Sequence, residues 1–357
     1  MVEKKEIQET ILKQNDVKSN NKPTEEELLN LLRLVAPGTN FRTALNGALK
    51  IGKGALVAVE NPKILQIIDG GFRINARFTP QRFMELTKMD GAIILSKDMK
   101  KINYANVMLA PDNKLKSVET GTRHKAAERT AKQTGTLVIA ISERKNEITL
   151  YYRNTRYPIL PTDELLQKAN NYLQIIEKQR ELFDMHVEKL TRLELRNHQS
   201  LSQSVAAMQK GILIQKIAEN LQKSIIELGN EGTLLKARLR EITHDVEKET
   251  DLIIKDYTNI NLKKTKDILE STPYENIEKE QILSALGFEN NQKIEAIMGW
   301  RILSKTSLSE SEIACLVKEM GSLGAVVHSN ISTYKNLLGS EQARVFNEEI
   351  SKIKIGS

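Results

Sequence analysis

The sequence pattern of this chain changes at Pro161. From about residue 25 to Pro161, short apolar runs typical of strands alternate with segments whose apolar residues have helical spacing. After Pro161 the strand-like runs stop, and apolar residues recur at helical spacing alone. The first pattern predicts an α/β domain with a central mixed sheet, and the second predicts an all-α region built from long helices.

The first pattern divides into individual elements. Thr24 and Glu27 form a capping box ahead of an apolar helix, and Pro37 with Gly38 ends that helix. Further helices are expected after Thr39, from Thr79 onward and over residues 123–133. The expected strands cover residues 55–59, 91–96, 102–107, 136–141 and 147–152.

The same patterns predict the domain organisation. Residues 1–24 are polar and are expected to form a mobile tail, and residues 25–157 should form the α/β domain. Residues 158–290 should form a helical spine. Residues 291–357, with shorter helices separated by glycines, should form a small helix-hairpin-helix-like module.

Composition excludes several classes of protein. The only cysteine, Cys315, cannot form a disulfide within the chain or a cysteine-based metal site. No apolar run in the first half approaches the roughly 20 residues that span a bilayer, and residues 1–22 lack the apolar core of a signal peptide. We therefore expect a cytoplasmic protein that makes no use of a membrane.

The net charge of +7 is unevenly distributed. Residues 25–160 contain 22 Lys and Arg against 13 Asp and Glu, whereas residues 291–357 contain eight against seven. An excess of positive charge on the α/β domain suits a small polyanion such as a nucleoside triphosphate, although a solvated basic surface is the simpler alternative. A module dedicated to gripping nucleic acid would usually carry more of the charge itself.

Three short segments of the α/β domain can support phosphate chemistry, in the absence of the common GxxxxGK[ST], GxGxxG and HExxH motifs. The first is Asp90-Gly91-Ala92, before the apolar run of residues 93–95. Turn chemistry alone explains most Asp-Gly pairs. The functional alternative is a carboxylate that binds a hard cation, with a glycine that lets the backbone approach a ligand closely.

The second and third segments are Gly121 to Lys125 and Ser142 to Lys145. The second puts Arg123, His124 and Lys125 in the first turn of a helix, where cations oppose the helix dipole and a bound anion would be stabilised. A solvated basic patch, with Thr122 as an ordinary N-cap, is the alternative. The third segment is either a polar hairpin turn or a contact to the ligand, with Glu143 as a second oxygen ligand.

The combination of Asp-Gly-Ala, Gly-Thr-Arg-His-Lys and Ser-Glu-Arg resembles the DisA family of diadenylate cyclases. The likeness extends to residues 34–39, 69–72, 86–95, 104–106 and 131–135, and later to residues 227–232 and 299–303. It therefore covers the chain from about residue 25 to residue 305, most strongly in the first domain.

The resemblance implies a nucleotidyltransferase that condenses two ATP molecules into cyclic di-AMP and two pyrophosphates. Each 3′-hydroxyl would attack the α-phosphorus of the other ATP across two facing domains. Asp90, Arg123, His124 and Lys125 would be catalytic, and Asp90, His124 and Glu143 would hold Mg²⁺ or Mn²⁺. The ATP site would contain Gly91, Ala92, Leu109, Gly121, Thr122, Arg123, His124, Lys125, Ala126, Ser142 and Arg144.

The resemblance also implies a homo-oligomer, an octamer, whose activity responds to DNA structure. Leu338, Gly339, Ser340 and Arg344 would form the tip that contacts DNA, but Leu337 stands where the family has the first tip glycine. Binding of branched DNA is therefore expected to be weak.

Two further residues depart from the family pattern near the second motif. Lys125 replaces an arginine, and Ala126 replaces the threonine of DisA proteins. Lysine keeps the charge but loses the bidentate fork. The alternative function is consequently a DNA-binding scaffold whose cyclase domain binds nucleotide without turning it over.

Overall fold

The computed structural model describes residues 22–273, 277–288 and 296–355, which form two compact units. Unit 1 contains the described residues up to Lys168 and the segment Lys223–Leu234. Unit 2 contains Ala169–Gln222 and the described residues from Leu235 onward. Most of the predicted tail, residues 1–21, lies outside the described residues.

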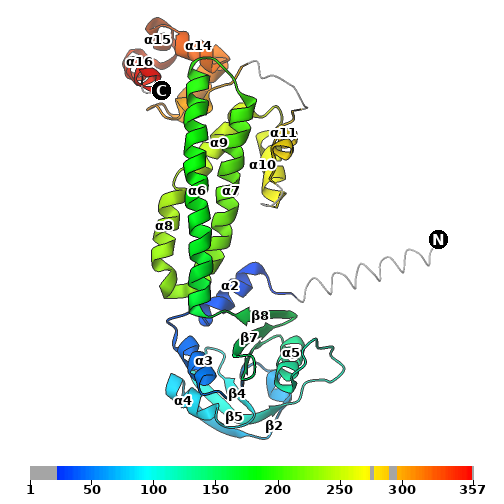
Figure 1. Cartoon of the computed structure of the whole chain (residues 1–357). Helices are drawn as coiled ribbons and strands as arrows, with labels where there is room; N and C mark the ends of the chain where they lie inside the picture. Colours follow the sequence, from blue (N-terminus) through cyan, green and yellow to red (C-terminus); the bar gives the residue numbers. More distant parts are fainter. Residues whose placement is uncertain (1–21, 274–276, 289–295, 356–357) are drawn as a thin grey trace, which may run out of the picture. The chain divides into compact units, whose positions relative to one another are not determined.

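Unit 1 is built on a mixed β-sheet (Figure 1). The strands are β1 (Ala55–Val59), β2 (Ile68–Asp69), β3 (Phe72–Arg77), β4 (Ala92–Leu95), β5 (Lys101–Leu109), β6 (Leu137–Ser142), β7 (Glu147–Tyr152) and β8 (Thr155–Ile159). Their order is β2-β5-β4-β1-β6-β7-β8, and β3 also pairs with β5. β1 and β4 are parallel, and the other pairs are antiparallel. This confirms the predicted α/β domain with its mixed sheet.

Helices cover both faces of this sheet. They are α2 (Glu25–Leu34), α3 (Asn40–Lys50), the short 3-10 helix η1 (Ile64–Gln66), α4 (Pro80–Leu86) and α5 (Thr122–Thr134). Side chains of β1 alternate between the faces: Ala55 and Val57 belong to the core under α3 and α4, whereas Leu56 and Ala58 belong to the core under α5. The sheet is therefore buried on both sides, as its nearly continuous apolar strands require.

Each strand and helix predicted from the sequence is present, but β2, β3 and β8 were not predicted. β8 lies at the edge of the sheet and contains Pro158, a residue that weakens any strand prediction. β3 has mostly exposed side chains, and Asn75 within it has a φ of 50° beside a shift in register with β5. These strands form because β5 and β7 offer unpaired edges, and apolar alternation contributes little to them.

After β8 the described chain is helical. The elements are α6 (Thr162–Leu195), α7 (Leu201–Leu228), the 3-10 helix η2 (Gly229–Gly232), α8 (Thr233–Thr243), α9 (Val246–Tyr257), α10 (Leu262–Ser271), α11 (Lys279–Ala285), α12 (Trp300–Leu303), α13 (Glu310–Met320), α14 (Leu323–His328), α15 (Ile331–Leu338) and α16 (Ser340–Ile355). Among the described residues, no helix combines the length and the apolar character needed to cross a bilayer.

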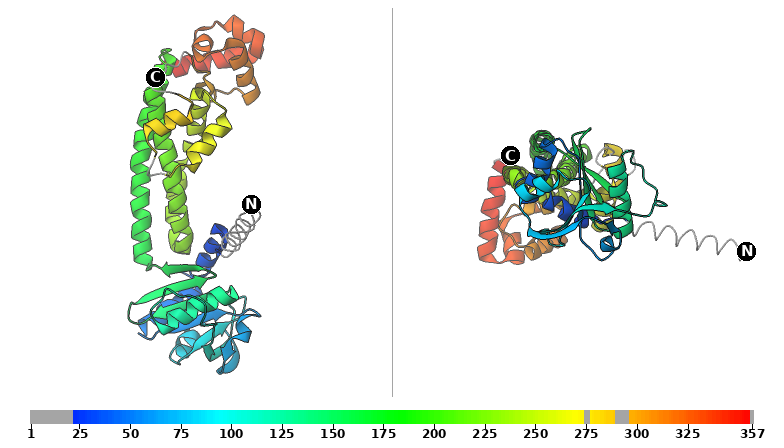
Figure 2. Two further views of the ribbon diagram at one scale, coloured as in Figure 1. Left: turned by 90° about the vertical axis from the view of Figure 1, so that its right-hand side faces the viewer. Right: turned by 90° about the horizontal axis from the view of Figure 1, so that it is seen from below.

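Unit 2 has one continuous core. α6 and α7 lie side by side (Figure 2), and His186 of α6 contacts Gln203 of α7 through a hydrogen bond of 3.3 Å. Leu190 of α6 and Ile253 of α9 belong to the same buried cluster as Phe346 of α16. The long helices and the C-terminal helices therefore share their hydrophobic interior.

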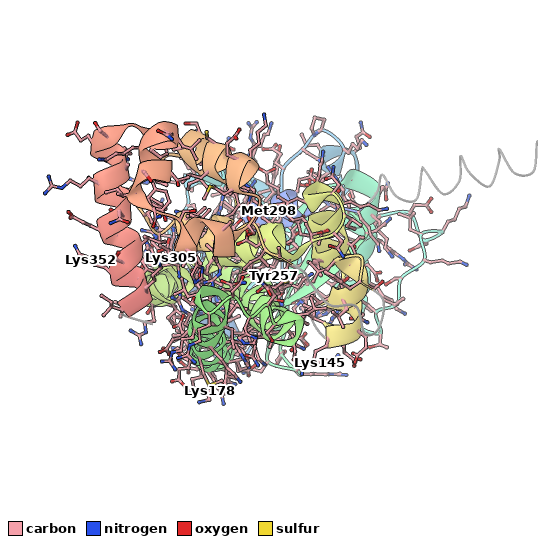
Figure 3. All side chains as sticks on the ribbon, turned by 90° about the horizontal axis from the view of Figure 1, so that it is seen from above. Lys145, Lys178, Tyr257, Met298, Lys305 and Lys352 are labelled. Carbon is pink, nitrogen blue, oxygen red and sulfur yellow. The ribbon has the colours of Figure 1, made fainter. Side chains whose placement is uncertain are left out.

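A buried ion network joins three helices of unit 2. The fully buried Arg301 of α12 pairs with Glu194 of α6 and, over 2.9 Å, with Glu249 of α9. Tyr257, labelled in Figure 3, donates to the other oxygen of Glu194 over 2.9 Å. Asp256 accepts hydrogen bonds from the backbone N–H groups at the start of α12, and burial raises its pKa to about 6.

Candidate functional site

Four strands of unit 1 have ends at one edge of the sheet. Because β1 and β4 are parallel, both begin at this edge, and the antiparallel β5 and β6 end there. Gly54 and Asp90 precede β1 and β4, while Leu109 and Ser142 close β5 and β6. We call this edge, together with the N-terminus of α5, the site edge. It gathers all three motifs identified in the sequence.

Asp90 is held at the site edge by its glycine neighbour. Gly91 has a φ of 90°, and a Cβ on it would lie 2.8 Å from the carbonyl carbon of Asn106 and 2.9 Å from the carbonyl oxygen of Val107. Only glycine fits this close approach to β5. The Asp90 side chain is exposed and makes no hydrogen bond or ion pair within the described residues. Its carboxylate is thus placed by the backbone and left free for a ligand.

The N-terminus of α5 is open. Gly121 is the N-cap, no side chain caps it, and the first turn contains no acidic residue. Thr122 is the first residue within the helix, so the interpretation of Thr122 as an ordinary N-cap was wrong. The three backbone N–H groups of the first turn are therefore available to an anion. Arg123, His124 and Lys125 follow, each partly buried.

The loop before α5 is fastened to the helix that follows it. Glu128 is buried and accepts hydrogen bonds from the Ser117 hydroxyl and, over 3.1 Å, from the Val118 N–H. Arg129 donates to the Leu115 carbonyl over 2.9 Å. Lys132 closes the cluster with an ion pair of 2.6 Å to Glu128. These contacts orient the loop that leads into the uncapped helix end.

His124 contacts a hydrogen-bond network that was not predicted from the sequence. Its ring meets the Tyr151 ring edge-on at 6.3 Å between centroids, and the Tyr151 hydroxyl donates to Glu119 over 2.7 Å. Arg156 also donates to Glu119, over 2.6 Å. Glu119, Tyr151 and Arg156 come from a loop and two strands, and no local pattern in the sequence links them.

The network sets protonation states at the site edge. Partial burial lowers the pKa of His124, against the raising influence of Glu119 and Glu147. Burial opposes ionisation of Glu119, but hydrogen bonds from Tyr151 and Arg156 outweigh it and lower the pKa of Glu119. At neutral pH, His124 is therefore mostly the uncharged imidazole, with one ring nitrogen able to accept a proton or a metal ion.

The remaining predicted ligand residues occupy two environments. Ala92 and Leu109 are buried and Ala126 is partly buried, all in the core beneath α5.

Glu143 and Arg144 are exposed in the turn between β6 and β7. Ser142 accepts a hydrogen bond of 3.3 Å from the N–H of Lys145, as a turn residue does. The turn role of this segment is thus present, and its exposed side chains remain free to meet a ligand.

The structure does not gather Asp90, His124 and Glu143 into one metal site. Within the described ranges, no group of three or more His, Cys, Asp or Glu side chains is placed to hold a metal ion.

The residues predicted to contact DNA lie in unit 2. Gly339, with a φ of 83°, joins α15 to α16, and Leu338 and Ser340 flank it. Arg344 of α16 is exposed and forms a loose ion pair of 3.6 Å with Glu348. The helix, single-glycine junction and helix agree with the predicted hairpin arrangement.

Comparison with known proteins identifies the family. The family model "DisA bacterial checkpoint controller nucleotide-binding" matches residues 42–156, and the model of the DisA linker region matches residues 160–295. Among solved structures, DacA from Staphylococcus aureus is similar over 34% of this chain and 85% of its own, at 23% identity and a TM-score of 0.30.

Curated relatives are similar over most of their length. The DNA integrity scanning protein DisA of Acetivibrio thermocellus is 34% identical over 342 residues, covering 92% of this chain and 95% of the relative. The protein of the same name from Thermotoga petrophila is 35% identical over 343 residues, covering 92% and 97%. That from Clostridioides difficile is 38% identical over 288 residues, covering 78% and 81%. The chain therefore belongs to the DisA family.

Proposed function

We propose that this protein is a diadenylate cyclase that condenses two ATP molecules into cyclic di-AMP and two pyrophosphates. The observation that carries the proposal is the site edge, which contains both the unpaired carboxylate of Asp90 and the uncapped N-terminus of α5. A free carboxylate suits a hard cation, and an open helix N-terminus suits phosphate. The match of residues 42–156 to a nucleotide-binding family model supports ATP as the ligand.

Each side chain has a role in this proposal. The N–H groups after Gly121, with Arg123 and Lys125, would bind polyphosphate oxygens and neutralise the charge that develops as pyrophosphate leaves. His124, held mostly neutral, would accept a proton or a hydrogen bond near the reacting hydroxyl. Ser142 and Arg144 would contact the nucleotide from the turn after β6.

A divalent metal ion is part of the proposal. When bound, Mg²⁺ or Mn²⁺ would lower the pKa of the attacking 3′-hydroxyl and shield the phosphate oxygens. The free carboxylate of Asp90 fits such an ion. Because the described residues offer no cluster of three ligands, one chain would supply only part of its coordination.

The chemistry requires two copies of unit 1, because one site edge contains one set of catalytic side chains and the reaction joins two nucleotides. Met89, beside Asp90, is 46% exposed, and Met108, near the end of β5, is 65% exposed. Large apolar side chains so exposed around a charged site favour a face that another molecule covers. We propose a homo-oligomer in which site edges face each other in pairs, with the octamer of the family resemblance as its size.

The proposal is tested by incubating the protein with ATP and either Mg²⁺ or Mn²⁺, followed by chromatography for cyclic di-AMP. We expect cyclic di-AMP and pyrophosphate, and sedimentation of the same preparation should show an oligomer. ATP binding without any product would instead support the nucleotide-binding scaffold. A fully active monomer would refute the facing pair.

Substitutions at position 125 test whether Lys125 contacts phosphate or is only part of a basic surface. We expect Lys125→Ala to lower kcat/KM by about tenfold or more, because a charge-assisted contact to phosphate is worth about 1.5 to 3 kcal/mol. Lys125→Arg should be tolerated, since it keeps the charge and adds a bidentate fork. Steady-state kinetics on the three proteins would decide. Equal kcat/KM in all of them would remove Lys125 from the phosphate site.

DNA binding by the hairpin should be weak and sensitive to salt. Leu337, at the position of the first tip glycine, belongs to α15 and packs against the core, and Glu341 adds a negative charge in the first turn of α16. We expect labelled four-way junction to bind full-length protein only at low salt. Tight, junction-selective binding at physiological salt that Ser340→Glu abolishes would show instead that the tip is competent.

A further inference from the structure

Arg123 occupies the space where a side chain at position 54 would lie. A Cβ built on Gly54 would be 2.0 Å from Nη1 of Arg123 and 2.7 Å from its Cζ. Both distances are shorter than real Cβ contacts, so even the smallest side chain at position 54 would displace the guanidinium. Gly54 immediately precedes β1 at the site edge, 69 positions before Arg123 in the sequence.

Space is the reason for glycine at this position. Gly54 does not have a positive φ, so a left-handed backbone conformation is not what requires glycine there. Gly52, two positions earlier, is the opposite case, with a φ of 73° and no atom within 4 Å of the place where its Cβ would lie. The contrast shows that Gly52 serves the turn, whereas Gly54 serves its neighbour across the sheet edge.

Arg123 lies beside Gly54 without a polar partner among the described residues. Its guanidinium makes no hydrogen bond or ion pair with any described residue, although its side chain is partly buried. Two other arginines of unit 1 are paired, Arg153 with Glu27 and Arg156 with Glu119. An arginine that is seated but unpaired keeps its N–H donors free for an external acceptor.

We propose that Gly54 is a positioning residue, whose missing side chain forms a recess that seats the Arg123 guanidinium so that its donors face the polyphosphate of the nucleotide. The inference rests on the proposed function, because it takes the site edge as the nucleotide site. Gly54 would act on the ligand only through Arg123. The recess would position Arg123 without using a hydrogen-bonding partner from the protein. A guanidinium that is already positioned loses less conformational freedom when it binds phosphate.

The test is a double-mutant cycle between Gly54→Ala and Arg123→Ala. With wild-type Arg123, we expect Gly54→Ala to lower kcat/KM by about 100-fold, the scale of a 1 Å misplacement. In the Arg123→Ala background the same substitution should change little, because no guanidinium is left to displace. Lys50→Ala, at an exposed position of α3, is the control and should leave kcat/KM unchanged in both backgrounds.

A second measurement does not depend on turnover. Calorimetric titration with inorganic tripolyphosphate should show about tenfold weaker binding for Gly54→Ala than for the wild type, and equal affinities for Arg123→Ala and the double variant. If the wild type binds tripolyphosphate but makes no cyclic di-AMP, the cyclase proposal fails while this inference is still tested.

The stability of the variants also distinguishes a clash with Arg123 from a clash with the backbone of β6. A Cβ at position 54 would also lie 3.0 Å from the Ile141 carbonyl oxygen, so thermal unfolding of Gly54→Ala is measured as well. If Gly54→Ala unfolds but the double variant is folded, the clash is with Arg123, as proposed. Equal losses in both backgrounds, or wild-type binding and activity in Gly54→Ala, would overturn the inference. Unfolding of both variants would place the requirement on β6 and would overturn it as well.

Discussion

Asp90→Asn should abolish detectable cyclic di-AMP formation, a loss of at least about 100-fold in kcat, while the protein folds and still binds ATP. The amide keeps the shape of the side chain but is a much poorer ligand for a hard divalent cation. Folding should be unaffected, because the Asp90 side chain makes no hydrogen bond or ion pair within the described residues. Product chromatography and ATP titration on the purified variant measure both quantities.

Asp98→Asn is the matched control for this substitution. Asp98 follows the far end of β4, where its carboxylate accepts hydrogen bonds from the Ser96 hydroxyl and the Lys100 N–H. The two aspartates therefore lie at opposite ends of one strand, and only Asp90 lies at the site edge. Asp98→Asn should keep full cyclase activity. Substantial activity in a well-folded Asp90→Asn protein would exclude the metal-binding role of Asp90.

Arg301→Ala should destabilise unit 2 by about 3 to 5 kcal/mol, the usual cost of leaving a buried charge without its partner. Arg301 and Glu194 are both fully buried, and Glu194 has no other cationic partner among the described residues. Trp300, the only tryptophan in the chain, begins α12 beside Arg301. Its fluorescence during denaturant unfolding therefore reports on unit 2 directly.

Two variants separate charge burial from a general loss of contacts. Arg238→Ala removes an arginine from exposed pairs with Glu177 and Glu241 in the same unit, and it should change stability little. Arg301→Met combined with Glu194→Gln should recover part of the loss of stability, because the uncharged glutamine removes the buried negative charge of Glu194. If Arg301→Ala unfolds like Arg238→Ala, the network contributes nothing measurable.

Much of unit 1 could be predicted because its strongest signals are local. Residues 55–59 form β1 with the predicted bounds, since an uninterrupted apolar run between polar segments suits a strand that is buried on both faces. The capping box of Thr24 and Glu27 is present, with hydrogen bonds of 2.9 and 3.2 Å. Edge strands such as β8 escaped prediction, because pairing partners rather than apolar pattern make them strands.

The candidate site, like the fold, contains residues that local sequence predicts and residues that it does not. Motif spacing identified Asp90 and the residues from Gly121 to Lys125, because adjacent residue types are enough to indicate an anion-binding helix start or a metal-binding carboxylate. Glu119, Tyr151 and Arg156 could not be found this way, since Glu119 is 32 and 37 positions away from its two partners in the sequence.

The order of an α/β domain followed by a helical region could be read from the sequence, and so could the three segments proposed for the chemistry. The tertiary structure places these segments at one edge of the sheet, because one parallel pair, β1 with β4, among antiparallel neighbours brings the starts of two strands and the ends of two others to that edge. It also decided that Asp90, His124 and Glu143, all within the described residues, do not form one metal cluster in a single chain. Gly54 is the clearest case: a glycine without a positive φ has no local signature, and its importance depends entirely on the guanidinium that fills the space beside it.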